Sequence, residues 1–373
     1  MLPGEVRYGI WHGPETPQDF DLGESVVTVI GEPCEIHCHG GEVAARRILD
    51  DLKQCGVAIV DQSQWLSAAV PELLIREATQ VLLQTTTTRT AAIAMDQVRG
   101  ALQRFVHQCD EWIASGNEQG VKFVHASVRE ILRHADVGMH LGKPWNVVLA
   151  GPPNVGKSSL INALLGYRRS ITVDQPGTTR DVLQADAVID GWPIRLSDTA
   201  GIRSTPGEKI EREGIDRAIA AIRDADLVLW VYDATQPIRD DEFAGLPQPA
   251  KSIVVRNKID LAIESEHSPI PARSGLIDIS ATKPLGVDTL QMAIIASLVP
   301  EALPPGCPVP LNVRQVDVLR KITNAKTASA IQTLLSEMTS RRDKAADLTL
   351  PFPGGSSLSE GRAALGIRSP LRP

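Results

Sequence analysis

The chain has 373 residues, of which 43% are hydrophobic and 22% are charged, and its formal net charge is −7. This length allows two or three domains, each with its own core. The acidic balance argues against a surface that binds nucleic acid throughout, although it leaves room for a local basic patch. No apolar run approaches the roughly 20 residues of a membrane-spanning helix, and the first residues lack the pattern of a signal peptide. We therefore expect a cytoplasmic protein without a membrane partner.

Five scattered cysteines do not form the pattern of a disulfide framework, so we expect reduced thiols. The segment Cys34-Glu-Ile-His-Cys-His39 could be interpreted as a metal site. On a strand, however, His37 and His39 would share one face and Cys38 would lie on the other. Zinc also prefers four ligands, and no partner cluster follows in the sequence. A strand followed by a glycine turn is therefore the favoured interpretation.

Residues 1–62 predict a small, truncated N-terminal α/β domain. Its expected elements are strands at 25–30, 34–38 and 57–60 and a helix from about 43 to 55. Residues 63–142 predict the first half of a helical domain, because apolar side chains recur at intervals of three and four. The stripe consists of Val98, Leu102, Phe105, Cys109 and Trp112. Such a stripe is typical of a helix-bundle seam.

Residues 143–300 predict an α/β domain, in which short apolar segments alternate with helical stretches. This pattern is typical of a doubly wound, mainly parallel sheet. The expected strands lie near 145–150, 186–190, 192–197, 226–232, 252–256 and 276–280. Residues 301–343 are again helical, so the α/β domain would be an insertion in one helical domain. We expect residues 344–373 to form a disordered tail, because they offer little to bury.

The first predicted strand of the inserted domain runs directly into Gly151-Pro-Pro-Asn-Val-Gly-Lys-Ser158. A strand, a glycine-bearing turn and a helix start are the context of a phosphate-binding P-loop. Lys157 would reach the outer phosphates, and the Ser158 hydroxyl would bind Mg²⁺. Thr179 would be a second Mg²⁺ ligand, and Asp198 would hold the ion through water.

The tetrapeptide Asn257-Lys-Ile-Asp260 identifies the base as guanine, since Asp260 can accept from the two guanine donors N1–H and N2–H. The predicted nucleotide is therefore GTP or GDP. The expected nucleotide contacts are Asn154, Val155, Gly156, Lys157, Ser158, Ser159, Gly201, Asn257, Lys258, Asp260, Ser280 and Ala281. Of these, Gly201 would sense the γ-phosphate, and the backbone at Ser280 and Ala281 would donate to guanine O6. Ile202 stands where many small GTPases place a glutamine that orients water, so another group must do so.

These motifs resemble the tRNA modification GTPase family called MnmE or TrmE. The resemblance is carried by Val173-Asp-Gln-Pro-Gly-Thr-Thr-Arg-Asp181, Asp198-Thr-Ala-Gly-Ile-Arg203 and Ile210-Glu-Arg-Glu-Gly-Ile-Asp-Arg217, together with the P-loop. It implies a GTPase domain inserted in a helical domain, and a homodimer joined through the N-terminal domains. It also implies action on the wobble uridine of tRNA with a flavin-dependent partner.

The resemblance further implies catalysis by Glu211, which would position the attacking water alongside Lys157 and Thr179. It implies potassium activation, with K⁺ bound by Asn154 and by loop carbonyls that include Val173 and Thr178. A monovalent cation there can replace the charge of an arginine finger. For Glu211, the alternative is an exposed carboxylate stabilised by the helix dipole.

Two features differ from the family pattern. Family members end in a cysteine-containing motif, whereas the last cysteine here is Cys307, and they begin with a segment that helps to bind a formyl-folate. From these differences we expect GTP hydrolysis without completed tRNA modification by this chain alone. One alternative is a diverged regulatory or ribosome-associated GTPase without tRNA modification activity, and another is a nucleotide-locked scaffold without turnover.

Overall fold

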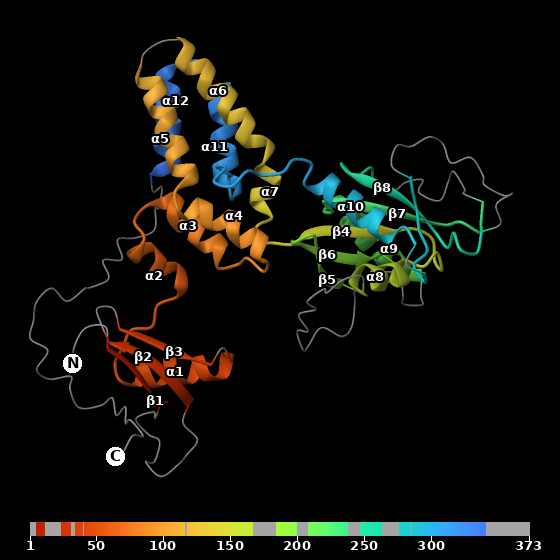
Figure 1. The fold of residues 1–373 in the computed structure, drawn as a ribbon, viewed down its shortest axis with the longest axis horizontal. Helices are drawn as coiled ribbons and strands as arrows, with labels where there is room; N and C mark the ends of the chain where they lie inside the picture. Colours follow the sequence, from red (N-terminus) through yellow and green to blue (C-terminus); the bar gives the residue numbers. More distant parts are fainter. Residues whose placement is uncertain are drawn as a thin grey trace, which may run out of the picture. The chain divides into compact units, whose positions relative to one another are not determined.

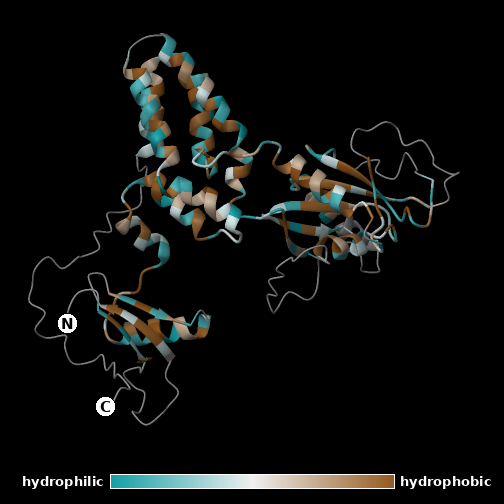
Figure 2. Cartoon of the chain, viewed as in Figure 1, coloured by the Kyte–Doolittle hydropathy of each residue, from teal (hydrophilic) through white to brown (hydrophobic). Residues whose placement is uncertain are grey.

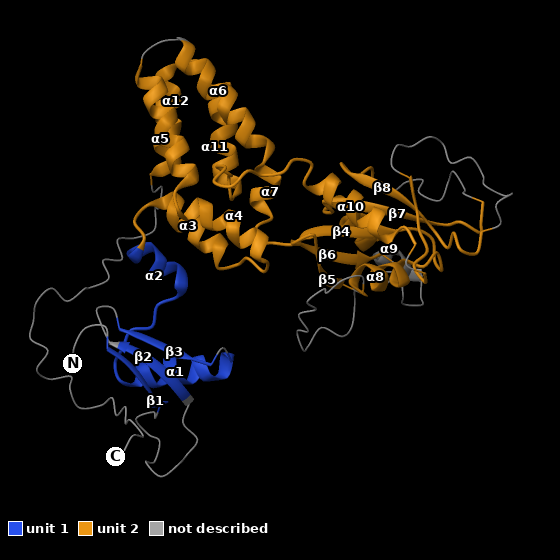
Figure 3. Ribbon diagram, in the orientation of Figure 1, with its two compact units in different colours: residues 1–69, 344–373 blue, residues 70–343 orange. Residues whose placement is uncertain are grey.

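The computed structural model describes residues 5–11, 24–30, 34–39, 41–115, 118–166, 184–199, 208–237, 247–262, 276–283 and 285–340. Residues 1–69 belong to one compact unit and residues 70–343 to another (Figure 3). The predicted tail at 344–373 lies outside the described residues. The predicted domain boundaries at 62, 142 and 300 stay predictions. In the described part of the chain, none of the helices is long and apolar enough to cross a membrane.

The N-terminal unit contains an antiparallel sheet in the order β1-β2-β3 and two helices. Its elements are β1 (Glu5–Trp11), β2 (Glu24–Ile30), β3 (Glu35–Cys38), α1 (Glu42–Gln54) and α2 (Gln62–Ala69). Trp11, Val26 and Ile48 form its buried core, and the Trp11 indole donates to Asp51 Oδ2 at 2.9 Å. In β3, Ile36 and Cys38 are half-buried whereas Glu35 and His37 are exposed, as alternation along a strand predicts.

Two elements of this unit differ from prediction. The strand β1 was not predicted, although Glu5–Trp11 pairs along its whole length with β2. The predicted strand at 57–60 is wrong, because these residues are exposed and form no strand. A short apolar run needs a neighbouring strand edge to become a strand. In this sheet β2 is the central strand, and β1 and β3 take its two edges.

The larger unit begins with helices that pack in a bundle (Figure 1). They are α3 (Leu73–Leu82), α4 (Thr88–Val98), α5 (Ala101–Ala114), α6 (Glu118–Arg133) and α7 (Ala135–Met139). The predicted stripe is buried or half-buried, but it spans two helices, since Gly100 at φ 86° separates α4 from α5. The Thr87 side chain caps α4 by accepting from the Thr90 N–H.

The helices α11 (Val313–Asn324) and α12 (Ala328–Thr339) complete this bundle after the inserted sheet. The helix α11 packs against α6, and α12 packs against α5. One hydrophobic cluster joins the two halves, and it includes Leu102, Phe105, Val128, Leu319, Ile322, Ile331, Leu335 and Met338. The helix–insert–helix prediction is therefore confirmed.

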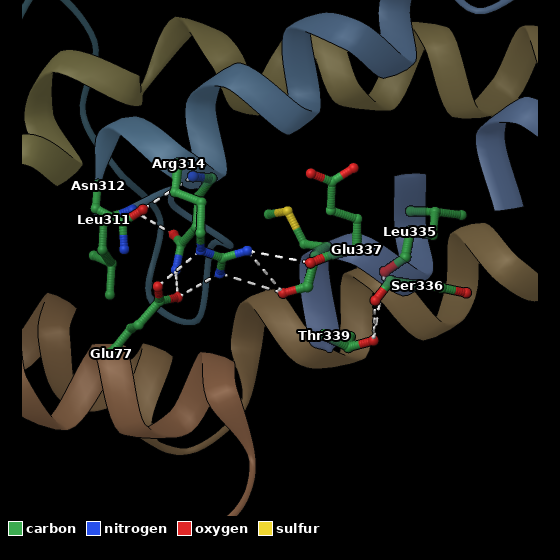
Figure 4. A network of polar contacts seen from close by, with 10 residues as sticks. Glu77, Leu311, Asn312, Arg314, Leu335, Ser336, Glu337 and Thr339 are labelled. Carbon is green, nitrogen blue, oxygen red and sulfur yellow. Dashed lines mark hydrogen bonds and ion pairs between the residues drawn. The ribbon is translucent and has the colours of Figure 1, made fainter. Parts of the chain in front are cut away.

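A polar network also ties the two halves together (Figure 4). Glu77 on α3 accepts from Arg314 on α11 at 2.9 and 2.6 Å and from the Gln315 side chain at 2.7 Å. The Arg314 guanidinium also donates to the Met338 carbonyl at 3.3 Å. On α4, the Gln97 amide donates to the Cys307 carbonyl at 2.9 Å. Apart from the bond to Met338, each of these bonds joins residues that are more than two hundred positions apart in the sequence.

The inserted domain contains a six-stranded sheet in the order β5-β6-β4-β7-β8-β9, in which β5 is antiparallel to β6 and the other pairs are parallel. The strands are β4 (Trp145–Ala150), β5 (Gln184–Ile189), β6 (Trp192–Asp198), β7 (Leu227–Asp233), β8 (Ser252–Asn257) and β9 (Leu276–Asp278). Figure 2 shows that these strands are largely hydrophobic. All six strands and the mainly parallel topology are as predicted.

Helices cover both faces of this sheet. They are α8 (Lys157–Gly166), α9 (Glu208–Arg223) and α10 (Val287–Leu298). Along β4, Val147 and Leu149 share one core with α8 and α10, whereas Val148 and Ala150 share another with Ile222 on α9. A parallel strand that is buried on both faces has consecutive apolar residues, as β4 has from Val147 to Ala150.

Candidate nucleotide-binding site

The candidate site lies at the carboxyl ends of the parallel strands. The strand β4 ends at Ala150, and the loop that follows reaches α8 at Lys157. Asp198 ends β6, Asp233 ends β7, and Asn257 ends β8. Ligands bind at this edge in doubly wound sheets, and a helix N-terminus there favours anions.

Lys157 folds back over its own loop. Its ammonium donates to the carbonyls of Gly151 at 3.0 Å and Pro152 at 2.8 Å, and the residue is only 4% exposed. The ammonium thus has hydrogen-bond partners although it is buried, and it lies where a helix N-terminus favours anions. The loop turns tightly, since Asn154 has a φ of 64°.

Ser158 and Asp198 meet at the start of α8. The Ser158 hydroxyl donates to Asp198 Oδ2 at 2.9 Å, and Asp198 is buried at 1% exposure. The next residue, Thr199, donates from its hydroxyl to the Leu149 carbonyl at 3.0 Å and so holds the end of β6 against β4. A hydroxyl and a carboxylate oxygen side by side are a donor set suited to Mg²⁺.

Asn257 joins the P-loop to the last strands of the sheet. Its amide nitrogen donates to the Val155 carbonyl at 2.8 Å, and its carbonyl oxygen accepts from the Ala281 N–H at 3.0 Å. The residue is 1% exposed. The asparagine thus fixes the P-loop and the loop around Ala281 to each other.

Gly156 is required by this contact. A Cβ atom at Gly156 would lie 2.3 Å from the Asn257 amide nitrogen, and the glycine has a φ of +95°. An L side chain would be strained in that conformation and would also displace the amide. The second glycine of the P-loop therefore makes room for the base motif.

Lys258 makes a second connection between the two motifs. Its φ is 65°, and its ammonium donates to the Asn154 carbonyl at 2.7 Å and to Asp233 Oδ2 at 2.6 Å. Burial raises the pKa of Asp233, but hydrogen bonds from Lys258 and Thr235 outweigh burial and lower it. Asp233 is therefore a charged anchor for Lys258.

Asp260 lies near the end of the base motif, with the Lys283 ammonium 3.5 Å from its Oδ2. A hydrogen bond from Ser280 and the charge of Lys283 lower the pKa of Asp260. The N–H groups of Ser280 and Ala281 already donate to Leu285 and to Asn257 within the chain. A contact from either N–H to guanine O6 would therefore have to share or release these bonds.

The structure brings together the predicted residues Asn154, Val155, Gly156, Lys157, Ser158, Asp198, Asn257, Lys258, Ser280 and Ala281. Ser159 follows Ser158 in the first turn of α8, and Asp260 faces Lys283 near Ser280. Four others, namely Val173, Thr178, Thr179 and Gly201, lie outside the described residues. Glu211 lies in the first part of α9, of which the backbone alone is described.

Asp233, Thr199 and Lys283 were missed at this site. Asp233 could have been predicted from the sequence, because it ends an apolar strand as Asp198 does. Lys283 could not, since its pairing with Asp260 depends on the loop that follows β9.

Comparison with known proteins identifies the type of site. Residues 146–258 match the family model described as 50S ribosome-binding GTPase. The chain is 31% identical to the tRNA modification GTPase MnmE of Thermotoga petrophila over 79% of this chain and 73% of that protein. It is 33% identical to the protein of the same name from a Synechococcus species, over 84% of this chain and 72% of that protein.

Among solved structures, Aquifex aeolicus Era bound to GDP and AlF₄⁻ is 29% identical, with a TM-score of 0.33, over 47% of this chain and 64% of that chain. The relatives and the family model agree with the P-loop and the base motif described above. The chain is a P-loop GTPase that belongs to the MnmE family of tRNA modification GTPases.

Proposed function

We propose that this GTPase acts in the modification of the wobble uridine of tRNA, together with a flavin-dependent partner. The proposal is supported by the relatives named above, each of which is called a tRNA modification GTPase. The resemblance between the sequence motifs and the MnmE family supports it as well. A homodimer joined through the N-terminal units belongs to the same proposal.

We propose that the pocket around Asp260 selects guanine nucleotides. Asp260 accepts from guanine N1–H and N2–H, and Lys258 lies along the ring. Support comes from the contacts that lower the pKa of Asp260, which include a hydrogen bond from Ser280 and the charge of Lys283. The contacts of Asn257 with Val155 and Ala281 support it too, because they hold the pocket next to the phosphate loop. Adenine has no pair of donors that matches a carboxylate in this way.

The phosphate end of the site is proposed to hold the triphosphate and Mg²⁺. The N–H groups of the loop and the Lys157 ammonium bind the phosphates. Ser158 and Thr179 bind the ion, and Asp198 holds it through water. The 2.9 Å contact between Ser158 and Asp198 supports this assignment. Bound Mg²⁺ neutralises charge that develops on the phosphoryl oxygens.

Potassium and Glu211 are proposed from the family resemblance. Asn154 with the carbonyls of Val173 and Thr178 would bind K⁺, and Glu211 would position the attacking water. The conformation of Asn154 supports the potassium site. Its backbone has a positive φ, and its carbonyl accepts from the Lys258 ammonium, so both features fix its position in the loop. Faster hydrolysis in potassium than in sodium at equal ionic strength is the expected result.

Asp260→Asn tests the base pocket. The variant should bind GTP more weakly and xanthosine triphosphate more tightly, because position 2 of xanthine carries an oxygen that accepts from the new amide. A loss of one charged bidentate contact corresponds to roughly 1.5–3 kcal/mol per hydrogen bond. Titration with fluorescent GTP and xanthosine triphosphate measures both changes. Unchanged GTP affinity in this variant would refute the assignment of Asp260.

The tRNA proposal needs a different measurement. The chain is expressed in a strain that lacks its own MnmE, and the wobble uridine is analysed by mass spectrometry. Restored modification that disappears in Lys157→Ala would support the proposal, and it would overturn the expectation from the sequence that this chain alone does not complete the modification. A diverged ribosome-associated GTPase is the second candidate, because the matching family model is described as ribosome-binding. That candidate is favoured if the wobble uridine stays unmodified and the chain co-purifies with ribosomal subunits instead.

A further inference from the structure

A cavity of about 540 Å³ lies in the helical part of the larger unit, apart from the nucleotide site. Its walls come from α5, α6 and the segment that follows α10. Apolar lining comes from Phe105, Trp112 and Ile131. Polar groups, namely Glu130, His134, Glu301 and Cys307, complete the lining. The cavity is therefore an apolar pocket with a few polar groups, which is the usual composition of a ligand site.

His134 is the unexplained residue of this cavity. It is 6% exposed and lines the cavity. Its backbone takes part in the junction of α6 and α7, yet its ring has no hydrogen-bond partner among the residues that the structure describes. In the described part of the chain, the fully enclosed side-chain atoms without a partner belong to Thr28, His125 and Trp145. The ring nitrogens of His134 are not among them, so they reach the cavity and are open to a ligand there.

Two carboxylates lie beside this imidazole. Glu130 lies in the last turn of α6, and His134 directly follows that helix as the N-cap of α7. Glu301 follows α10 and reaches the same point from the returning chain. One ligand atom from each of the three lies within 4.8 Å of the others. It is the one such group of three among the described residues.

Arg133 already neutralises part of this charge. It pairs with Glu130 and, at 3.5 Å, with Glu301. These pairs are more than half exposed on the arginine side, so solvent weakens them. Each carboxylate has a second oxygen, which the arginine contacts given above do not use. The guanidinium therefore leaves one oxygen of each glutamate available, and it leaves the imidazole unexplained. A charged group that holds ligating carboxylates in place is a common feature of metal sites.

We propose that Glu130, His134 and Glu301 bind one divalent transition-metal ion, whose remaining coordination positions face the cavity. The ion supplies the partner that the buried imidazole lacks. Imidazole nitrogen together with carboxylate oxygen suits Zn²⁺ and its neighbours in the first transition row. Mg²⁺ prefers oxygen ligands alone and should bind poorly here. Cys307 lines the cavity outside this group of three, and burial raises the pKa of its thiol.

Zinc chloride added to the full chain tests the proposal. The protein is first stripped with a chelator and then loaded with GDP and excess Mg²⁺, which occupies the nucleotide site. Zinc bound after desalting is counted by elemental analysis, and affinity is measured by competition with a chromophoric chelator. We expect one equivalent of zinc in the wild-type chain that is lost in both Glu301→Gln and His134→Gln.

Controls separate this site from others. Cys307→Ser should keep the equivalent, because the thiol is not in the ligand group. Cys38→Ser should also keep the bound zinc. If this variant lost the zinc, the metal would lie in the N-terminal unit and the proposal would be overturned. Glu301 is half exposed, so Glu301→Gln should fold normally and keep its GTP turnover, and its melting temperature should no longer rise with zinc. Equal zinc binding by wild type and Glu301→Gln, or full displacement of the zinc by millimolar Mg²⁺, would overturn the proposal.

Discussion

Buried polar side chains are used differently in the sheet and in the helical bundle. In the sheet they gather at the carboxyl ends of the strands, where Lys157, Asp198, Asp233, Asn257 and Ser280 lie. Their contacts run mainly to loop carbonyls and to one another. In the bundle, the half-buried Glu77 and the buried Gln97 and Gln315 join segments that lie on either side of the inserted sheet in the sequence.

The difference separates two purposes of a buried polar group. At the sheet edge such groups fix loops whose N–H groups and side chains bind the nucleotide, so the polar groups serve a ligand. In the bundle they fix which helices pair, because an unpaired Glu77 or Gln97 would be destabilising in any other arrangement. Changes at the sheet edge should therefore impair nucleotide binding most, and changes in the bundle should impair stability without an effect on the site.

Gly156→Ala should have the largest effect and should act on nucleotide binding. The new Cβ would lie 2.3 Å from the Asn257 amide, at a φ of +95°. Backbone strain of this kind corresponds to roughly 1–3 kcal/mol, and displacement of Asn257 adds to it. We expect GTP affinity, measured by titration with a fluorescent analogue, to fall by at least about tenfold.

Gly166→Ala is the matched control, since a Cβ there meets nothing within 4 Å. It adds the same methyl group at the other end of α8. The control should bind GTP like the wild type. Equal affinities of the two variants would contradict the close contact between the P-loop and the base motif.

Glu77→Ala should have a smaller effect and should act on stability. The variant leaves Arg314 and Gln315 without their carboxylate. Arg314 is about one-third exposed, so solvent replaces part of what is lost. We expect the free energy of unfolding to fall by roughly 1–3 kcal/mol, with GTP affinity unchanged.

A double-mutant cycle with Arg314→Ala and urea unfolding isolates the pair. The double variant should lose less than the sum of the single losses. Additive losses would mean that the two side chains act independently. A change in GTP affinity in Glu77→Ala would contradict the expectation that polar groups of the bundle affect stability and not nucleotide binding.

Local patterns predicted much of the inserted domain. Strands β4, β7 and β8 each contain an uninterrupted apolar run, namely 147–150, 227–232 and 253–255, and the P-loop follows β4 directly. Such segments depend little on distant partners, because a parallel strand buried on both faces is apolar throughout. The order of the motifs along the chain then placed Asp198 and Asn257 at one edge of the sheet.

Other features depend on partners that no local pattern reveals. The strand β1 forms because β2 offers it an edge, while the apolar residues 57–60 have no such neighbour and stay outside the sheet. Gln97 and Glu77 have partners more than two hundred residues away. Likewise, Glu301 meets His134 only because the chain returns from α10 to the bundle. Sequence spacing predicts contacts along one element and cannot predict these.

A substitution where the bundle meets the inserted sheet should have the smallest effect on stability, and that effect should depend on pH. His140, just after α7, stacks on Trp145 of β4 with ring centroids 3.7 Å apart, and its Nε2 lies 3.2 Å from Asp226 Oδ2. Burial raises the pKa of Asp226, but the hydrogen bonds from His140 and the Asn146 N–H, with the charges of His140 and Lys251, outweigh it. The pKa therefore lies below its ordinary value of 3.8.

A carboxyl whose pKa is lower in the folded chain than in the unfolded chain stabilises the fold above the unfolded value, and this contribution is lost as pH falls through the folded value. Asp226→Asn should therefore reduce the free energy of unfolding by about 1 kcal/mol or less at neutral pH. The difference from the wild type should shrink as the pH falls below about 4. Urea unfolding of both proteins between pH 3 and 7 measures it. A difference that stays constant over this range would show that the charge of Asp226 does not stabilise the contact between the bundle and the sheet, and that the packing of His140 on Trp145 does.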